Sequence, residues 1–202
     1  MYIENFMENQ IQKVVEKLNP DYIAGYVDGE GCFGLQFRKD IRHERPGKPV
    51  YYSWKAQFMI AARKDELCLF KRIKYTFGCG EIYNQKKDDE ANMEIHYCVS
   101  NLDDLKNIIS PFFKEHQLQA KKRYDFELWA EAIDIMYRNK KKTLNITRGQ
   151  KGFSKNKWDK NDLSRLITLH SKMQKYKATR PNGLKHIDMA TKLLIEIVPD
   201  KK

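Results

Sequence analysis

The chain has 202 residues, 41% of them hydrophobic, which is enough for a packed core. Its formal net charge of +11 indicates a polyanionic partner, with nucleic acid the first candidate. The sequence lacks the long apolar run of a membrane span and the basic and apolar regions of a signal peptide. We therefore expect no membrane association and an intracellular protein, in a chloroplast, a mitochondrion or a bacterial or phage cytoplasm. Four irregularly spaced cysteines without a CxxC pair argue against a disulfide framework and a zinc site.

A short helix over residues 1–18 begins the predicted fold, because apolar residues recur on one side of it. Asn19 and Pro20 are typical of the N-cap and the first position of a new helix. That helix runs through the sequence DYIAGYVDG and ends at Gly29 and Gly31.

Two hairpins and two helices follow. Alternation of apolar and polar residues predicts half-buried strands, and apolar residues three or four apart predict helices. The strands are expected at 32–38, 51–61, 80–86 and 93–100, and the helices at 64–77 and 102–113. The order helix, strand, strand, helix, strand, strand, helix is an α+β fold.

The remainder of the chain is helical with one basic interruption. Helices are expected at 120–138, 161–176 and 186–197. From Arg138 to Lys160 there are nine Lys or Arg residues against one acid, Asp159. Such runs are usually solvated surface loops. Because this one carries most of the excess charge, we interpret it as a phosphate-contacting segment that includes Lys140, Lys141 and Lys142. We assign 1–135 to a core and 136–202 to a basic loop and helical extension of the same domain.

The segment YIAGYVDGEGCF combines small residues with an acidic end. Gly25 and Gly29 are four residues apart, which places them on one face of a helix. Ala24 and Asp28 have the same spacing, so this face is nearly free of large side chains and another backbone can approach it closely. The pattern favours a helix pair at a two-fold axis, with Ala24, Gly25 and Asp28 at the interface. Glu30 would lie just past the helix end, beside its symmetry mate.

This segment resembles the signature that names the LAGLIDADG homing endonuclease family, and residues 23–31 match it position by position. The resemblance extends through the following strand, the second hairpin and the sequence SPFFKEHQLQAKKRYDFELW, and so covers roughly residues 20–135. It implies that the four strands form a saddle-shaped sheet whose concave face lies in the major groove of DNA. A β-ribbon is narrow enough for that groove.

The resemblance also implies an activity and an assembly. Members with a single motif are homodimers, and two-fold symmetry implies a palindromic or nearly palindromic site of about 20 base pairs. The reaction is hydrolysis of phosphodiester bonds in both strands, leaving short 3′ overhangs, and the usual biology is intron mobility. Glu30 and Gly29 would hold Mg²⁺ or Mn²⁺, since Mg²⁺ is usually bound through one or two carboxylates plus substrate phosphates.

The resemblance to the family also implies roles for further residues. A lysine near the active site is best matched by Lys121, or by Lys122 if the alignment slips by one. A polar residue that positions water in some relatives is replaced by Ala62, so that Arg63 or ordered solvent would substitute for it. The DNA-binding residues expected on the sheet are Gln36, Arg38, Lys55, Gln57, Tyr83, Gln85 and His96.

Two other functions use the same fold. One is an intron RNA maturase, for which the basic aromatic segment at 138–160 would suit structured RNA. The other is a DNA-binding regulator, which would not need the carboxylate of Glu30 and usually carries a recognisable helix-turn-helix. The presence of Glu30 favours the nuclease.

Overall fold

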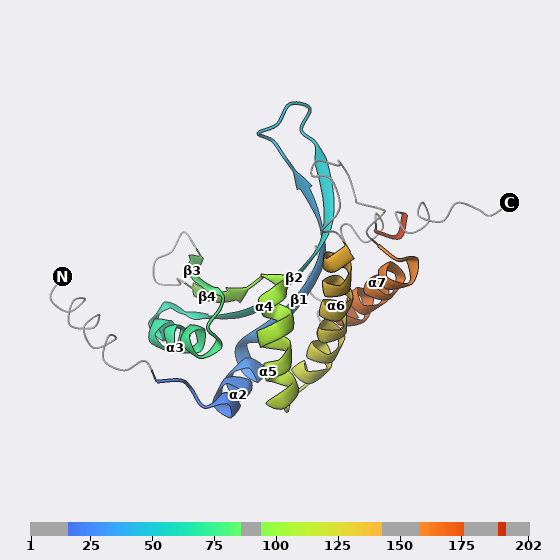
Figure 1. Cartoon of the computed structure of the whole chain (residues 1–202). Helices are drawn as coiled ribbons and strands as arrows, with labels where there is room; N and C mark the ends of the chain where they lie inside the picture. The colour runs from blue at the N-terminus through green and yellow to red at the C-terminus, as the bar shows by residue number, and fades with distance from the viewer. Residues whose placement is uncertain (1–15, 86–93, 143–157, 176–189, 193–202) are drawn as a thin grey trace. The chain divides into compact units, whose positions relative to one another are not determined.

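The computed structural model describes residues 16–85, 94–142, 158–175 and 190–192, and every structural statement below concerns these ranges. They contain a four-stranded sheet in the order β1-β2-β4-β3 together with helices (Figure 1). The predicted α+β class is therefore confirmed. Within these ranges every helix is too short or too polar to span a bilayer. The helix expected at 1–18 lies almost wholly outside them, and residues 16–19 are not helical.

Helix α2 (Pro20–Glu30) begins and ends where the sequence predicts. The Asn19 side chain accepts hydrogen bonds from the backbone N–H groups of Asp21 and Tyr22, which satisfies two donors of the first turn. At the other end the N–H of Gly31 donates to the carbonyl of Val27. A Cβ at Gly31 would lie 2.5 Å from Cγ1 of Val27, so glycine is needed for the chain to pass directly from helix to strand.

The sheet consists of β1 (Gly31–Ile41), β2 (Val50–Arg63), β3 (Glu81–Gln85) and β4 (Glu94–Val99). Strand β4 pairs antiparallel with both β2 and β3. The strands of the first hairpin are longer than predicted, because pairing continues into the charged loop. The predicted alternation is confirmed in the first hairpin except at Gly34, which was expected on the polar face and is buried. Buried on one face are Phe33, Leu35, Phe37, Trp54, Ala56, Phe58 and Ile60, whereas Gln36, Arg38 and Lys55 are exposed.

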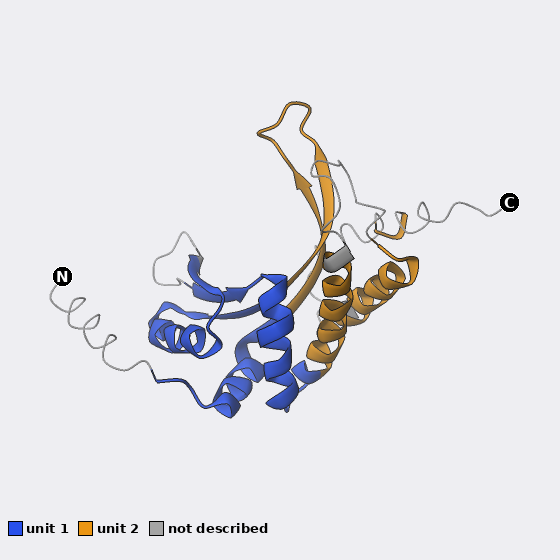
Figure 2. Cartoon of the chain, viewed as in Figure 1, with its two compact units in different colours: residues 1–32, 57–123 blue, residues 33–56, 124–202 orange. Residues whose placement is uncertain are grey.

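The chain divides into two compact units (Figure 2). Unit 1 comprises residues 1–32 and 57–123. It contains α3 (Leu67–Phe77) and one continuous helical stretch made of α4 (Leu102–Asp104), the π-helical turn η3 (Leu105–Ile109) and α5 (Ser110–Glu115). Its aromatic core includes Phe58, whose ring centroid lies 5.3 Å from that of Phe113 and 6.3 Å from that of Tyr97.

Unit 2 comprises residues 33–56 and 124–202. The indole of Trp129 on α6 (Lys122–Lys142) packs on Phe33 and donates a hydrogen bond of 3.2 Å to the carbonyl of Gly34. Helix α7 (Lys160–Lys175) is joined to α6 by the two-bond ion pair of Arg165 with Glu131, at 2.6 and 2.8 Å. Helix α6 continues without a break through the boundary expected at 135. Of the basic segment, residues 143–157 lie outside the described ranges, and of the last predicted helix only residues 190–192 are described, as helix.

Candidate active site at the end of the motif helix

The C-terminal end of α2 brings an acid and a base together within unit 1. Glu30, the last residue of the helix, is exposed. The ammonium of Lys122 donates hydrogen bonds of 2.9 Å to the carbonyls of both Val27 and Gly29. A cation is stabilised there because the C-terminal carbonyls carry the negative end of the helix dipole. One end of one helix thus presents a carboxylate beside a fixed positive charge.

Lys122, and not Lys121, is therefore the lysine at the motif. Lys121 is exposed, whereas Lys122 is half-buried. Lys121 is the last residue of the turn before α6 and Lys122 is the first residue of the helix, so the two side chains start from different backbone conformations. Their neighbourhoods consequently differ even though their sequence contexts are almost the same. Lys122, the alternative to Lys121 in the sequence-based prediction, is thus the lysine that contacts the motif helix, and the catalytic role of either lysine stays a prediction.

Asp28 faces its own chain and not the exposed side of the helix. Its Oδ2 accepts hydrogen bonds from the backbone N–H groups of Gln119 at 2.7 Å and Ala120 at 3.1 Å. Ala24 is also inward, with 6% of its surface exposed. Of the three residues expected at the interface, only Gly25 is on the exposed face of α2.

The exposed face of α2 is a stripe formed by Tyr22, Gly25, Tyr26 and Gly29. No atom lies within 4 Å of the position a Cβ would take at Gly25 or Gly29. The rings of Tyr22 and Tyr26 stack with centroids 6.4 Å apart. Burial, with the nearby charges of Glu66 and Glu30, raises the pKa of Tyr26 to about 12, so its hydroxyl stays protonated at neutral pH. The spacing i, i+3, i+4, i+7 that defines this stripe was visible in the sequence, but the tyrosines were not included in the prediction.

The oxygen atoms at this helix end suit a hard divalent cation. Carboxylate and carbonyl oxygens are the ligands that Mg²⁺ and Ca²⁺ prefer, and Glu30 offers an exposed carboxylate at the end of a row of carbonyls. Among the described residues, no three His, Cys, Asp or Glu side chains come together as a ligand group. The carbonyl of Gly29, predicted as a metal ligand, accepts a hydrogen bond from Lys122. The chemistry of the donors fits Mg²⁺, and one chain supplies one carboxylate.

The polar face of the sheet in unit 1 carries an exposed tyrosine on its edge strand β3. Tyr83 and Ala61 are both paired with His96 in the register, so the three form a row across β3, β4 and β2. Tyr83 is 45% exposed and its ring lies 5.3 Å from that of His96, which is only 9% exposed. The hydroxyl of Tyr83 lies 3.8 Å from the sulfur of Met59, and burial raises its pKa. Of the predicted pair, Tyr83 is presented to solvent and His96 is largely covered.

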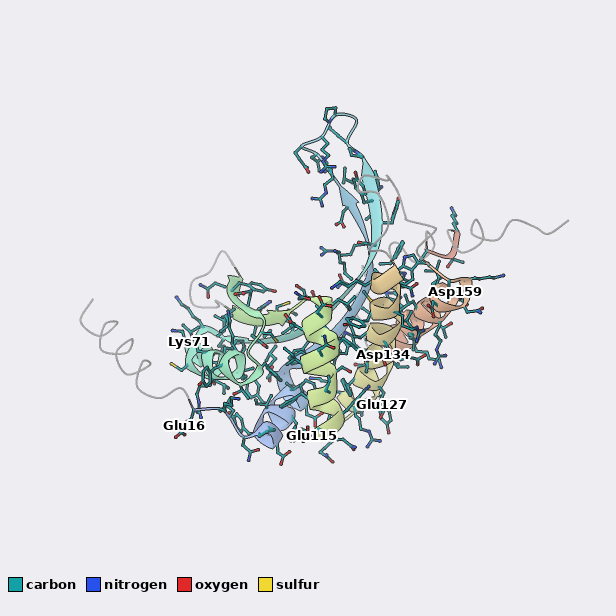
Figure 3. All side chains as sticks on the ribbon, viewed as in Figure 1. Glu16, Lys71, Glu115, Glu127, Asp134 and Asp159 are labelled. Atoms are coloured by element: carbon teal, nitrogen blue, oxygen red, sulfur yellow. The ribbon has the colours of Figure 1, made fainter. Side chains whose placement is uncertain are left out.

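The remaining predicted DNA-binding residues are placed as follows. Gln36 and Arg38 on β1 and Lys55 on β2 are exposed, and Gln57 on β2 is half-buried. Side chains extend from the hairpin of β1 and β2 along its length (Figure 3). Gln85 lies in β3 and Lys141 and Lys142 in α6, but their side chains are outside the description; Lys140 is exposed on α6. Arg63, the candidate substitute for a polar residue at Ala62, is bonded to Asp65 at 2.8 Å.

A family model described as LAGLIDADG endonuclease matches residues 23–133, which is more than half of the chain. The chain belongs to this family. The matched region contains the motif helix from Ile23 to Glu30 and the start of α6 with Lys122.

Individual relatives agree with this assignment. The chain is 30% identical over 128 residues to "Probable intron-encoded endonuclease 2" of Neurospora crassa, a match that covers 63% of this chain and 26% of the relative. It thus spans about a quarter of that relative's length. Among solved structures, the homing endonuclease I-TnaI matches with a TM-score of 0.59 and 21% identity over 91% of this chain and 100% of that one. I-SmaMI, bound to uncleaved DNA target in the presence of calcium ions, matches with a TM-score of 0.55 and 25% identity over 86% of this chain and 49% of that one.

Proposed function

We propose that two copies of this chain together cut both strands of a long, nearly palindromic DNA site, with Mg²⁺ or Mn²⁺ as cofactor and short 3′ overhangs as product. The observation that carries the proposal is the exposed Glu30 at the end of the motif helix, with the ammonium of Lys122 fixed at the same helix end. The relatives named as intron-encoded endonucleases support a role in intron mobility.

The division of labour at the site follows from its charges. Glu30 and its symmetry mate would hold the divalent cations, together with the carbonyl of Gly29 and oxygens of the scissile phosphate. When bound, such an ion lowers the pKa of a water molecule and offsets negative charge on the phosphate. Lys122 would supply a positive charge, already oriented by the carbonyls of α2, toward the charge that develops on the phosphate oxygens.

DNA binding is assigned to the polar face of the sheet and to its basic flanks. Arg38 and Lys55 are exposed in unit 2, and Tyr83 is exposed in unit 1. Gln36, Gln57 and Gln85 carry the donor and acceptor groups that read base edges in the major groove. Lys140, Lys141 and Lys142 would contact phosphates without reading sequence. The solved structure of I-SmaMI on its DNA target supports DNA as the substrate class.

The homodimer is supported by the exposed face of α2. Gly25 and Gly29 leave open space there, so a second copy of the helix can approach backbone to backbone. Tyr22, which is 51% exposed, and the half-buried Tyr26 add aromatic surface that a second copy can cover. A two-fold axis beside this stripe would bring two Glu30 carboxylates together, which completes the ligand set that one chain supplies only in part.

The test is a cleavage selection on randomised DNA with Mg²⁺, followed by Glu30→Gln on the site recovered. The substitution keeps side-chain size and removes the charge. We expect cleavage of both strands to fall by at least about 100-fold, since even partners that only orient metal ligands cost 10- to 100-fold when removed. Specific binding of the intact site should persist or tighten, because like-charge repulsion with phosphate falls.

The matched control is Glu115→Gln, which removes the same charge at the exposed end of α5 (Figure 3). It should cut as fast as the parent. If Glu30→Gln also cuts at the parental rate, the catalytic assignment fails. If the parent cuts no DNA but binds its own intron RNA tightly, the chain is a maturase instead.

A further inference from the structure

We propose that Asp28 is a positioning residue that holds the α5–α6 connection, residues 117–121, in the one place from which Lys122 reaches the carbonyls of α2. The catalytic consequence of this role rests on the proposed function, whereas the placement of Lys122 does not. Asp28 is assigned here neither to the metal nor to the dimer interface.

A single oxygen of Asp28 fixes the connection. Its Oδ2 accepts the N–H groups of two consecutive residues, Gln119 at 2.7 Å and Ala120 at 3.1 Å. Two N–H donors on one carboxylate oxygen define both the position and the orientation of the peptide between them, and bonds to a charged acceptor are the stronger kind. Leu118, with 1% of its surface exposed, anchors the same connection in the core. The connection is therefore held both by the hydrogen bonds to Asp28 and by the burial of Leu118.

Lys122 depends on that placement because its side chain is long and freely rotating. An ammonium on a four-carbon stem can reach two particular carbonyls only if its backbone starts from the right point. Lys122 lies two residues after Ala120, at the first position of α6. The carbonyls it reaches, of Val27 and Gly29, flank Asp28 in the chain. The last turn of α2 thus makes two kinds of contact. The side chain of Asp28 binds the backbone of the connection, and the backbone carbonyls on either side of Asp28 bind the ammonium of Lys122.

The other oxygen of Asp28 indicates which substitutions are informative. Oδ1 is buried and accepts no hydrogen bond from the residues that the structure describes. An asparagine can therefore keep its carbonyl oxygen toward Gln119 and Ala120 and turn its NH₂ toward the position of Oδ1. It retains the geometry but loses the charge. Alanine loses both. The position of Lys122 should therefore be fixed most firmly in the parent, less firmly in Asp28→Asn and least firmly in Asp28→Ala.

The direct test is acetylation of lysines in the folded full-length protein, quantified residue by residue by mass spectrometry. In the parent, Lys122 should react more slowly than its exposed neighbour Lys121, because its ammonium is bonded to two carbonyls. In Asp28→Ala, Lys122 should react about tenfold faster, as expected for local release without global unfolding, while Lys121 is unchanged. Asp28→Asn should lie between the two. If Lys122 keeps its parental rate in folded Asp28→Ala, the proposal is wrong.

The kinetic test uses a double-mutant cycle on the selected site. If Asp28 acts through Lys122, Asp28→Ala should lower kcat without raising KM for DNA, and adding it to Lys122→Met should cause no further loss. A purely structural role would instead give an additive loss together with a lower melting temperature. If the parent does not cleave DNA at all, the proposed function fails, while the acetylation series still decides the placement.

Discussion

Lys121 and Lys122 carry the same charge in adjacent positions, yet only one of them meets the motif helix. Lys122 bonds to the carbonyls of Val27 and Gly29, and Lys121 is exposed to solvent. The difference comes from the register of α6, which begins at Lys122 and leaves Lys121 in the turn before it. Sequence alone cannot fix that register, because either lysine continues the helical pattern equally well.

The two lysines give a test at the residue scale. Lys122→Met keeps the length of the stem and removes the charge, and we expect it to lower kcat on the selected site on the order of 10- to 100-fold. Lys121→Met should cause the smaller loss of the two. Single-turnover cleavage with the protein in saturating excess over the DNA measures both. If Lys121→Met lowers the rate more than Lys122→Met does, the lysine that takes part in the reaction is Lys121.

Helix α2 shows what a spacing rule can and cannot predict at the element scale. Its bounds followed from Asn19, Pro20 and the glycines, and the structure confirms them. The rotation of the helix about its axis did not follow, because Ala24 and Asp28 share the four-residue spacing of Gly25 and Gly29 but point to the interior. Small residues on a helix face indicate that another backbone packs closely against it. They do not indicate whether that backbone belongs to the same chain or to a second copy.

The exposed stripe of α2 predicts the assembly. A leucine at Gly25 would fill the open space that a second helix needs, so Gly25→Leu should shift a dimer of about 48 kDa, twice 24.0 kDa, toward the monomer. Light scattering at several concentrations measures the shift. Gly25→Ala should cause a smaller shift, because its single methyl group meets no atom within 4 Å in one copy and can obstruct only the second copy. A 24 kDa monomer that cuts both strands would show that the two-fold arrangement is wrong.

The strands were the most predictable elements, because alternation of apolar and polar residues also fixes which face is buried. Phe33, Leu35 and Phe37 are buried as expected, and Gln36 and Arg38 are exposed. The alternation of residue types could not show which side chains of the polar face are covered by their neighbours. Tyr83 and His96 are both predicted on the polar face, but their rings pack 5.3 Å apart and His96 is only 9% exposed. Cross-strand contacts of this kind depend on register, which pairs strands distant in the sequence.

At the level of the whole molecule, we expect charge to set the affinity for DNA and the sheet to determine which site is bound. The net charge of +11 is concentrated near the end of α6 and in the segment that follows it. Replacing Lys140, Lys141 and Lys142 by Gln should therefore reduce the slope of log K against log salt by up to about 2.7, because each phosphate contact contributes about 0.9. The preferred site in the selection should not change.

The control for this charge experiment is a triple variant that removes three exposed lysines elsewhere, Lys114, Lys172 and Lys192. It lowers the net charge equally and should leave the salt slope closer to that of the parent. A changed site preference with an unchanged slope would assign Lys140, Lys141 and Lys142 to base recognition.

The central claim is that two copies of one chain, each contributing one Glu30, cut the two strands of a single site. Sequencing both DNA ends produced by the purified protein with Mg²⁺ on the selected site tests it most directly. We expect one cut in each strand, related by the two-fold axis of an inverted repeat and leaving equal 3′ overhangs, with neither cut made by Glu30→Gln. A single nick, or two cuts that no two-fold axis relates, would contradict it.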